Sequence, residues 1–258
     1  MVGYSLIAAV SEIHATLWSG TTSTDLGTIA GDHSSAVGIN AKGQVAGNST
    51  ISDESVSHAA LWSDGTATDL GTLGGISSSA TGINDSGWVV GDAETTGDSH
   101  THAVVWKEGA STDLGTLPGG GYSYAMAINN RGVVVGYSTL HAEAETHATV
   151  WEGTQILDLR TLGGQFSMAL GINDAGLVVG NAALKGNSST HVALWIGRQI
   201  YDLNDLLDGS GRGWTLLEAR GINSSGQIVG WGRTLWGQQH GFLLTPTKPI
   251  PLSPKGGS

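Results

Sequence analysis

Histidine and aspartate, residues that can bind metal ions or transfer protons, recur along this chain at nearly constant intervals. Each histidine opens a short apolar run such as His58-Ala59-Ala60-Leu61-Trp62, and each aspartate precedes a leucine. The histidines are His14, His58, His102, His147, His191 and His240. The aspartates are Asp25, Asp69, Asp113, Asp158 and Asp202. Such regular sets raise the question of a metal site or of acid-base catalysis.

Even spacing argues against both uses. A metal ion needs three or four ligand atoms about 2 Å away, whereas one histidine per repeat distributes the rings along the fold. We therefore expect no metal and no cofactor. Each histidine is predicted to close a strand and to hydrogen-bond a neighbouring turn or an Asp-Leu strand, because a half-buried imidazole needs partners. The aspartates, and the asparagines of the repeated Gly-Ile-Asn triplets, suit turn capping.

The elements that position these residues are short strands. Each repeat holds four runs of β-branched and apolar residues separated by Gly, Asn, Asp and Ser, without helical periodicity. In one repeat they cover residues 80–84, 88–92 and 102–106 and a run that ends at Asp113. The turn Asp85-Ser86-Gly87 supplies the positive φ that a tight hairpin needs.

Four strands in about 44 residues, joined by a Gly-rich link, is the spacing of a β-propeller blade. We predict an all-β protein in which residues 1–245 form one propeller of four-stranded antiparallel blades. A β-solenoid is the main competitor, although its coils are usually about half this length. Two strand types occur six times and two occur five times, which favours six blades with an incomplete closing blade over five. Residues 246–258 are predicted to be an extended proline-containing tail that ends in a linker or tag remnant.

Composition excludes several partners. The net charge is −11 with 11 Lys plus Arg, so the basic surface of a nucleic-acid or anionic-membrane binder is missing. The chain has no cysteine, which removes disulfides and thiolate ligands. No run approaches the roughly 18 apolar residues of a membrane span, so we expect no membrane insertion. We also expect a monomer.

The combined motifs His-Ala-x-Leu-Trp, Thr-Asp-Leu-Gly-Thr-Leu-Gly-Gly and Gly-Ile-Asn-x-x-Gly-x-Val-Val-Gly resemble the HAF repeat family, named for its His-Ala-Phe triplet. The similarity covers roughly residues 2–245. It implies a bacterial protein that is secreted or held in the cell envelope, with the leader absent from this chain, and it brings no activity, cofactor or catalytic residue. The chain departs from the family by placing another residue where phenylalanine is expected, at Thr16, Ala60, Val104, Thr149 and Ala193.

A localised function should break the repeat symmetry. The recurring tryptophans Trp18, Trp62, Trp106, Trp151 and Trp195 are therefore interpreted as core between adjacent blades. The last repeat replaces its Gly-rich link with residues 204–214 and contains Trp214, Trp231 and Trp236. With Arg212, Arg233, Gln238 and Gln239, these rings suit sugar or peptide binding, or they seal an irregular closing blade.

Smaller irregular groups lie in loops. His100 with Asp98, and His141 with Glu143 and Glu145, precede their strands and are interpreted as solvated polar loops. Asp205 and Asp208 faintly suggest a cation loop, but their spacing does not follow a calcium motif.

Three functions remain open at this point. The first is a non-catalytic extracellular or envelope-associated scaffold that binds a glycan or a peptide. The second is a propeller hydrolase or lyase, which would gather unlike ionisable residues with shifted pKa values at one mouth of the central channel. The third is an engineered or truncated repeat protein without a ligand. No catalytic residue is assigned, because the sequence lacks a nucleophile elbow, a phosphate loop and a His-Glu-x-x-His motif.

Overall fold

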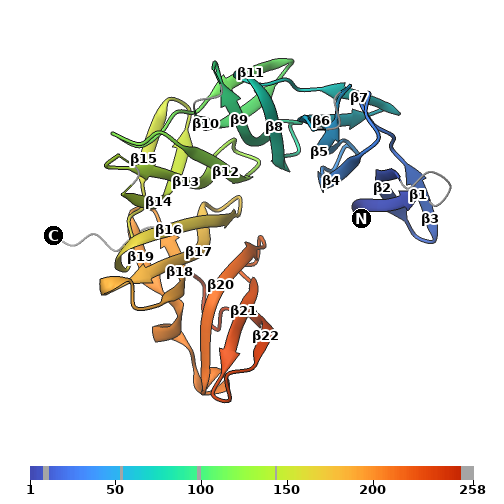
Figure 1. The fold of residues 1–258 in the computed structure, drawn as a ribbon. Coiled ribbons are helices and arrows are strands. Elements are labelled where there is room, and N and C mark those ends of the chain that lie inside the picture. Colours follow the sequence, from blue (N-terminus) through green and yellow to red (C-terminus); the bar gives the residue numbers. More distant parts are fainter. Residues whose placement is uncertain (8–11, 53–54, 98–99, 143, 251–258) are drawn as a thin grey trace. The chain divides into compact units, whose positions relative to one another are not determined.

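A computed structural model describes residues 1–7, 12–52, 55–97, 100–142 and 144–250, and strands dominate it. The chain divides into two compact units (Figure 1). Unit 1 comprises Met1–Gly115 and Tyr122–Asn130, and unit 2 comprises Thr116–Gly121 and Arg131–Ser258. Antiparallel strand pairing dominates both units, with a parallel strand pairing in unit 2, between Thr146 and Phe166. The prediction of an all-β protein is confirmed.

In unit 1 each sheet is formed by strands that follow one another in the chain. The first sheet contains β1 (Val2–Ile7), β2 (Glu12–Ser19) and β3 (Thr22–Asp25). The second contains β4 (Ser34–Ile39), β5 (Val45–Thr50), β6 (Ser57–Ser63) and β7 (Thr66–Asp69). The third contains β8 (Gly74–Ile83), β9 (Val89–Thr95), β10 (Thr101–Lys107) and β11 (Ala110–Asp113). The unit also holds β12 (Ser123–Ile128).

Unit 2 repeats this organisation and departs from it at its C-terminal end. It begins with β13 (Val134–Leu140), β14 (Glu145–Glu152) and β15 (Gln155–Asp158). Next come β16 (Gly163–Ile172), β17 (Leu177–Leu184), the 3₁₀ turn η1 (Lys185–Asn187), β18 (Thr190–Ile196) and β19 (Gln199–Asp202). Two further 3₁₀ turns, η2 (Leu203–Leu206) and η3 (Gly209–Gly211), lead to the last sheet. That sheet contains β20 (Trp214–Ile222), β21 (Ile228–Thr234) and β22 (Gln239–Leu244).

The observed strands confirm the predicted repeat and its unequal strand counts. The β4–β7, β8–β11 and β16–β19 sheets each have the four expected strands in sequence order. The first sheet begins with the Val-Gly strand, and the last sheet ends with the His240 strand, so each has three strands in the described part of the chain. The missing type in the last sheet is the Asp-Leu strand.

The repeated asparagine and glycine residues determine the geometry of the hairpin turns. In the turn between β8 and β9, Gly87 has φ +90°, a conformation that favours glycine. The Asn84 side-chain oxygen accepts the backbone N–H groups of Ser86 and Trp88 at 3.0 Å each, which closes the turn. Further along, a Cβ on Gly91 would lie 1.8 Å from the Ser79 carbonyl oxygen, so only glycine permits this approach beside the bulge in β8.

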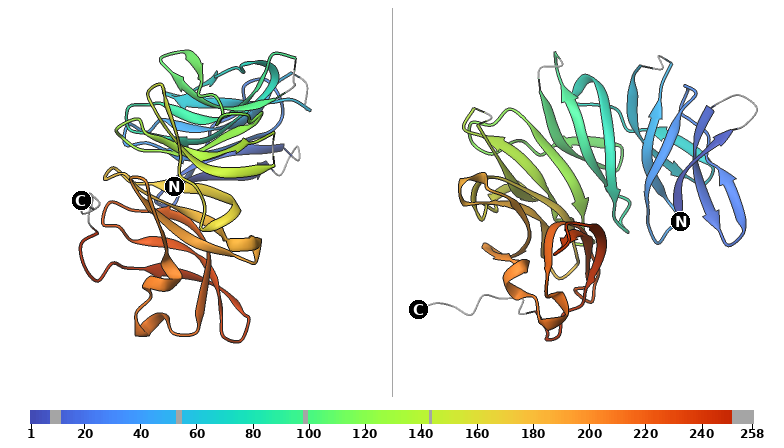
Figure 2. Two further views of the ribbon diagram at one scale, coloured as in Figure 1. Left: turned by 90° about the vertical axis from the view of Figure 1, so that its left-hand side faces the viewer. Right: turned by 60° about the horizontal axis from the view of Figure 1, so that its bottom comes forward.

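Within unit 1 successive sheets pack face against face, as the β4–β7 and β8–β11 sheets show in Figure 2. Small residues from one sheet meet a tryptophan from the next: Trp62 packs with Ala15 of the first sheet, and Trp106 packs with Ala46 and Ala59 of the second. Trp151 and Trp195, in unit 2, are also buried. These four rings confirm the prediction that the repeated tryptophans form core, while Trp18 in the first sheet is half-buried.

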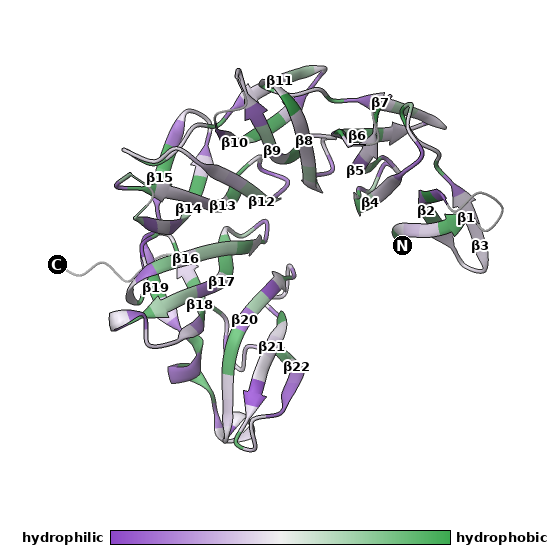
Figure 3. Ribbon diagram, viewed as in Figure 1, coloured by the Kyte–Doolittle hydropathy of each residue, from purple (hydrophilic) through white to green (hydrophobic). Residues whose placement is uncertain are grey.

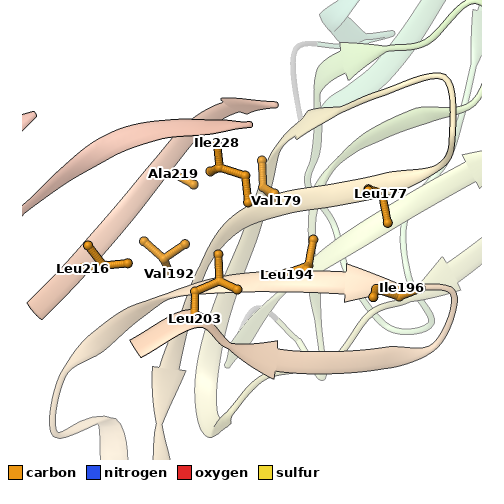
Figure 4. Close-up of a cluster of buried hydrophobic side chains, with 9 residues drawn as sticks. All are labelled: Leu177, Val179, Val192, Leu194, Ile196, Leu203, Leu216, Ala219 and Ile228. Carbon is orange, nitrogen blue, oxygen red and sulfur yellow. The ribbon is translucent and has the colours of Figure 1, made fainter. Parts of the chain in front are cut away.

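An apolar cluster of unit 2 lies between the β16–β19 sheet and the last sheet. Figure 3 shows hydrophobic stretches along β18 and β20, and Figure 4 shows the side chains that meet there. Val179, Val192 and Leu194 contact Leu216 and Ile228 across this interface. Burying each of these side chains contributes about 1.5–3 kcal/mol of transfer free energy, which holds the last sheet on its neighbour.

Candidate functional site

Five of the six repeated histidines bind the aspartate of the adjacent strand. The distance from Nδ1 to the nearer carboxylate oxygen is 2.9, 2.8, 2.8, 2.9 and 2.6 Å in chain order. The pairs are His14–Asp25, His58–Asp69, His102–Asp113, His147–Asp158 and His191–Asp202. The predicted bonding of histidine to the Asp-Leu strand is therefore confirmed in these repeats.

Each aspartate has a second structural role, because it accepts the backbone N–H of the residue two positions later, at 2.6–2.9 Å. The turn-capping prediction is thus confirmed for the aspartates. Burial alone would raise the pKa of Asp158, but hydrogen bonds from His147 and from the Arg160 N–H outweigh it and hold the pKa below its usual value. The pKa of Asp25 is lowered in the same way. A lowered pKa keeps these two carboxylates ionised, and in that form they accept the N–H groups of the turns.

The asparagines link neighbouring repeats as well as capping turns. The Asn40 side-chain amide donates to the Asn84 backbone carbonyl at 3.1 Å, and Asn84 donates in turn to the Asn129 carbonyl at 3.1 Å. In unit 2, Asn173 donates to the Asn223 carbonyl at 3.0 Å. Capping was predicted from the sequence, but this ladder from repeat to repeat was not.

A buried serine with a structural role was also missed. Ser78 Oγ accepts the Ala59 N–H at 3.0 Å and donates to the Gly71 carbonyl at 2.7 Å, which joins β8 to the preceding repeat. Equivalent bonds are made by Ser34, Ser123 and Ser167. The signal was present, since each serine stands two residues before the alanine of the Ala-x-Gly-Ile-Asn or related run.

The symmetry ends at the last repeat, where unit 2 contains an open groove of about 760 Å³. One wall comes from β18 and β19, the opposite wall from β20–β22, and the rim from η2, η3 and residues 245–250. Most of the lining is apolar and aromatic, including Tyr201, Leu203, Trp214, Ile228 and Phe242. The groove is open because no fourth strand covers β22 among the described residues. A largely apolar cleft with a few polar groups is the usual form of a binding site.

The structure separates the three tryptophans that the sequence grouped together. Trp214 lines the groove, and its ring meets that of His240 edge-on with centroids 6.1 Å apart. Trp231 lies on the opposite face of the sheet, because paired residues share a face, Leu216 pairs with Gly232, and Trp231 is the residue before it. There its indole N–H donates to Glu218 Oε1 at 3.3 Å.

The remaining members of that group are exposed. Trp236, in the β21–β22 turn, has 84 % of its surface accessible. Arg212 lies beside η3, while Arg233 shares the face of Trp231. Gln239 pairs with Arg233 and therefore lies on that same face. Trp214 is thus the one predicted aromatic residue in the groove, and a ligand-binding role for the set stays a prediction.

Polar groups at the groove are few and largely engaged. The Tyr201 hydroxyl donates to Gln199 Oε1 at 2.6 Å. Asp208 accepts the backbone N–H and the hydroxyl of Ser210 at 2.9 and 2.6 Å. These bonds lower the pKa of Asp208. Asp205 is exposed in the first turn of η2, so the two carboxylates have separate surroundings.

The loop candidates are dispersed. The His100 ring lies near those of His102 and Tyr122, with centroid distances of 6.5 and 5.3 Å. Glu145 lies 3.5 Å from His147 Nε2, and His141 occupies an exposed turn. Asp98 and Glu143 lie outside the described residues. Within the described ranges no three His, Asp or Glu side chains are placed to hold a metal ion together.

Asp92 in β9 is an acid of unit 1 whose pKa is strongly raised. Burial between β9 and β12, and secondarily the negative charge of Glu94, raise its pKa to about 6. Burial and the charge of Asp92 raise the pKa of Tyr124 as well. Two other repeats have asparagine at this register position: Asn48, whose Oδ1 accepts the Ala80 N–H at 2.7 Å, and Asn181. The remaining repeats have Tyr4, Tyr137 and Trp231 there. Asp92 does not line the groove.

Comparison with known proteins adds limited information. No family model and no curated protein matches the chain. Among solved structures, an acylaminoacyl peptidase of Pyrococcus horikoshii is 17 % identical with a TM-score of 0.48 over 86 % of this chain. The alignment spans 36 % of the peptidase. A mutant Aleuria aurantia lectin in complex with Fucα1-6GlcNAc is 16 % identical with a TM-score of 0.38, covering 98 % of this chain and 93 % of the lectin. At these identities and TM-scores the two likenesses carry no argument about function, so the candidate site is identified from the groove alone.

In the described residues no helix is long and apolar enough to cross a membrane.

Proposed function

We propose that this chain is a non-catalytic binding scaffold, and that its ligand site is the groove beside Trp214. The single observation that carries this proposal is the groove itself, an apolar cleft of about 760 Å³ at the point where the repeat pattern is interrupted. Elsewhere the repeated His and Asp side chains bond each other, and the repeated Asn and Ser side chains bond backbone groups. In the last repeat, by contrast, apolar and aromatic side chains line an open groove and are available to contact a ligand.

The ligand class favoured by the lining is a peptide with apolar side chains. Leu203, Trp214, Ile228 and Phe242 offer contact surface to such side chains, whereas a glycan would need many more free hydrogen-bonding groups. The chain's own residues 246–250, Pro-Thr-Lys-Pro-Ile, line the groove and pack Ile250 against its floor. This segment supports the view that an extended peptide fits there.

The wider setting is proposed from the sequence. The repeats are proposed to close into a six-bladed β-propeller over residues 1–245, with the chain acting as a monomer. Membership of the HAF repeat family, and a secreted or envelope location in a bacterium, are part of the same proposal. The support is the repeated four-stranded unit and the family motifs quoted above.

A peptide-array screen followed by titration calorimetry tests the binding function. Peptides with apolar residues should bind, and Trp214→Ala should weaken binding at least tenfold, since buried aromatic contacts dominate peptide affinity. Trp236→Ala is the matched control, because its ring is exposed and does not line the groove. Glycans that bind better than any peptide, or equal losses in the two variants, would contradict the proposal.

A further inference from the structure

Within the residues that the structure describes, the last sheet has no strand at the place that each complete repeat fills beside its histidine strand. In the complete repeats this fourth strand brings two partners: an aspartate for the histidine Nδ1, and a leucine N–H for a backbone carbonyl. In the second sheet, Asp69 lies 2.8 Å from His58 Nδ1, and the Leu70 N–H donates to the Ala59 carbonyl at 3.0 Å. The fourth strand is thus bound by both its side chain and its backbone.

In the last repeat the histidine and the backbone carbonyl that bind this strand are both present. His240 corresponds to His58, and Gly241 corresponds to Ala59. Along this sheet the described strands end at β22, and both residues are exposed. No aspartate bonds His240 within the described part of the chain, in contrast to the other five histidines.

The residues that follow β22 do not have the chemistry of the missing strand. The segment after Leu244 reads Thr-Pro-Thr-Lys-Pro-Ile-Pro-Leu-Ser-Pro and contains no acidic residue. Its prolines lack the N–H that a strand must donate. Instead of folding back along β22, residues 246–250 line the groove.

We infer that β22 receives an antiparallel strand from a partner protein, and that an aspartate on this strand binds His240. The inference rests on the proposed peptide-binding function and specifies how the peptide is held. Strand addition to an open sheet edge is an established mode of peptide recognition, with backbone bonds giving affinity and alternate side chains giving specificity.

The complete repeats fix the register of the added strand. In the β16–β19 sheet, Asp202 pairs with Ala193 and Ile200 pairs with Trp195. Since Ala193 and Trp195 correspond to Phe242 and Leu244, the partner's aspartate lies opposite Phe242, and an apolar residue lies opposite Leu244. Both face the groove, because His240, Phe242 and Leu244 alternate along one face of β22. The predicted recognition sequence is Ile-x-Asp-Leu.

The chain itself provides the probe. A synthetic peptide with the sequence of residues 154–160, Thr-Gln-Ile-Leu-Asp-Leu-Arg, reproduces a natural fourth strand. It should bind the full chain, and an Asp-to-Asn peptide should bind about tenfold more weakly, because a hydrogen bond to a charged group is lost. His240→Ala should bind both peptides equally, while His100→Ala, which alters an exposed histidine of unit 1, should retain the preference.

A backbone change in the peptide separates strand addition from simple groove binding. N-methylation of the leucine after the aspartate removes the N–H that would donate to the Gly241 carbonyl, and it should abolish binding. N-methylation of the aspartate itself should be tolerated, because its N–H points away from β22 in this register. Both peptides are measured on the unmodified protein, so a folding defect cannot explain the result.

The outcomes discriminate between the two proposals. Binding that ignores the aspartate, His240 and the N-methyl position would overturn strand addition and leave the groove function intact. Failure of the probe to bind, when other apolar peptides bind in a Trp214-dependent manner, would also overturn strand addition alone. If no peptide binds at all, both proposals are wrong.

Discussion

At the residue scale, the same side chain has different surroundings in different repeats, and these differences distinguish structure from function. A histidine held by its aspartate is saturated and stabilises a strand pair. His240 has the same side chain, but among the described residues no aspartate bonds it. Asp92 is the converse case, an acid at a position where two other repeats have asparagine, Asn48 and Asn181. The composition does not reveal the bonding state of His240 or the raised pKa of Asp92, because each depends on the residues that surround the side chain in the fold.

We predict that Asp92→Asn stabilises the protein at neutral pH. The pKa of Asp92 is raised from 3.8 to about 6, so the folded state holds its proton more tightly than the unfolded state. Stability is therefore lost as the pH rises from about 4 to 6. Asparagine has no charge to bury, and the gain at pH 7 should be on the order of 2 kcal/mol.

Urea unfolding of both proteins at pH 4 and pH 7.5 measures this effect. The advantage of Asp92→Asn should nearly vanish at the lower pH, where the wild-type carboxyl is protonated. Glu152→Gln, at an exposed position of β14, is the control and should show little change at either pH. A gain that is the same at both pH values would argue against burial of the charge as its cause.

At the element scale, the asparagine turns join sheets that share no strand pairing. Asn84 is buried and makes three bonds, two within its own turn and one to the Asn129 carbonyl. Asn223 makes the same turn bonds, to the N–H groups of Ser225 and Gln227, and its amide donates to Gln227 Oε1 at 2.8 Å, so all three of these bonds lie within its own turn; it is exposed. Comparing the two isolates the contribution of the link between sheets.

Asn84→Ala should lower the free energy of unfolding by about 2–4 kcal/mol, since each buried bond contributes about 1 kcal/mol and unpaired groups cost more. Asn223→Ala should cost about 1 kcal/mol, because water can replace its partners. Thermal and urea unfolding with equal protein concentrations provide the measurement. Equal losses in the two variants would show that the ladder between sheets adds nothing to the turn itself.

At the scale of the whole molecule, the question is how the sheets are arranged. Within each unit, sheets that follow one another in the chain bury side chains against each other, as the clusters around Trp62 and Val179 show. In the last sheet the counterpart of Val179 is Val229, which is 48 % exposed. A closed propeller is the proposed arrangement that leaves the fewest such faces open to water.

Small-angle X-ray scattering and paired spin labels test the closed ring. A compact domain of this length should have a radius of gyration of about 18 Å. The chain has no cysteine, so Thr22→Cys and Gln238→Cys introduce labels at two chosen sites only. A closed ring predicts one short, narrow distance distribution between the first and last sheets. A long or broad distribution, with a larger radius, would exclude it.

The sequence alone determined the local features of this protein. The 44-residue period, the alternation of strand residues and the Asn-x-x-Gly turns specify four-stranded antiparallel units, because hairpin chemistry and side-chain periodicity act between residues close in the chain. The histidine–aspartate pairs, eleven residues apart, followed from the same local logic. So did the location of irregular residues in the last repeat.

Only the tertiary structure decided which irregular residues meet. Trp214 and Trp231 are close in sequence, but a bulge and the pleat place them on opposite faces of one sheet. The groove lies between residues of two sheets, and the asparagine ladder joins residues of different repeats. Contacts of this kind depend on how distant segments pack, and no pattern within a single repeat records them.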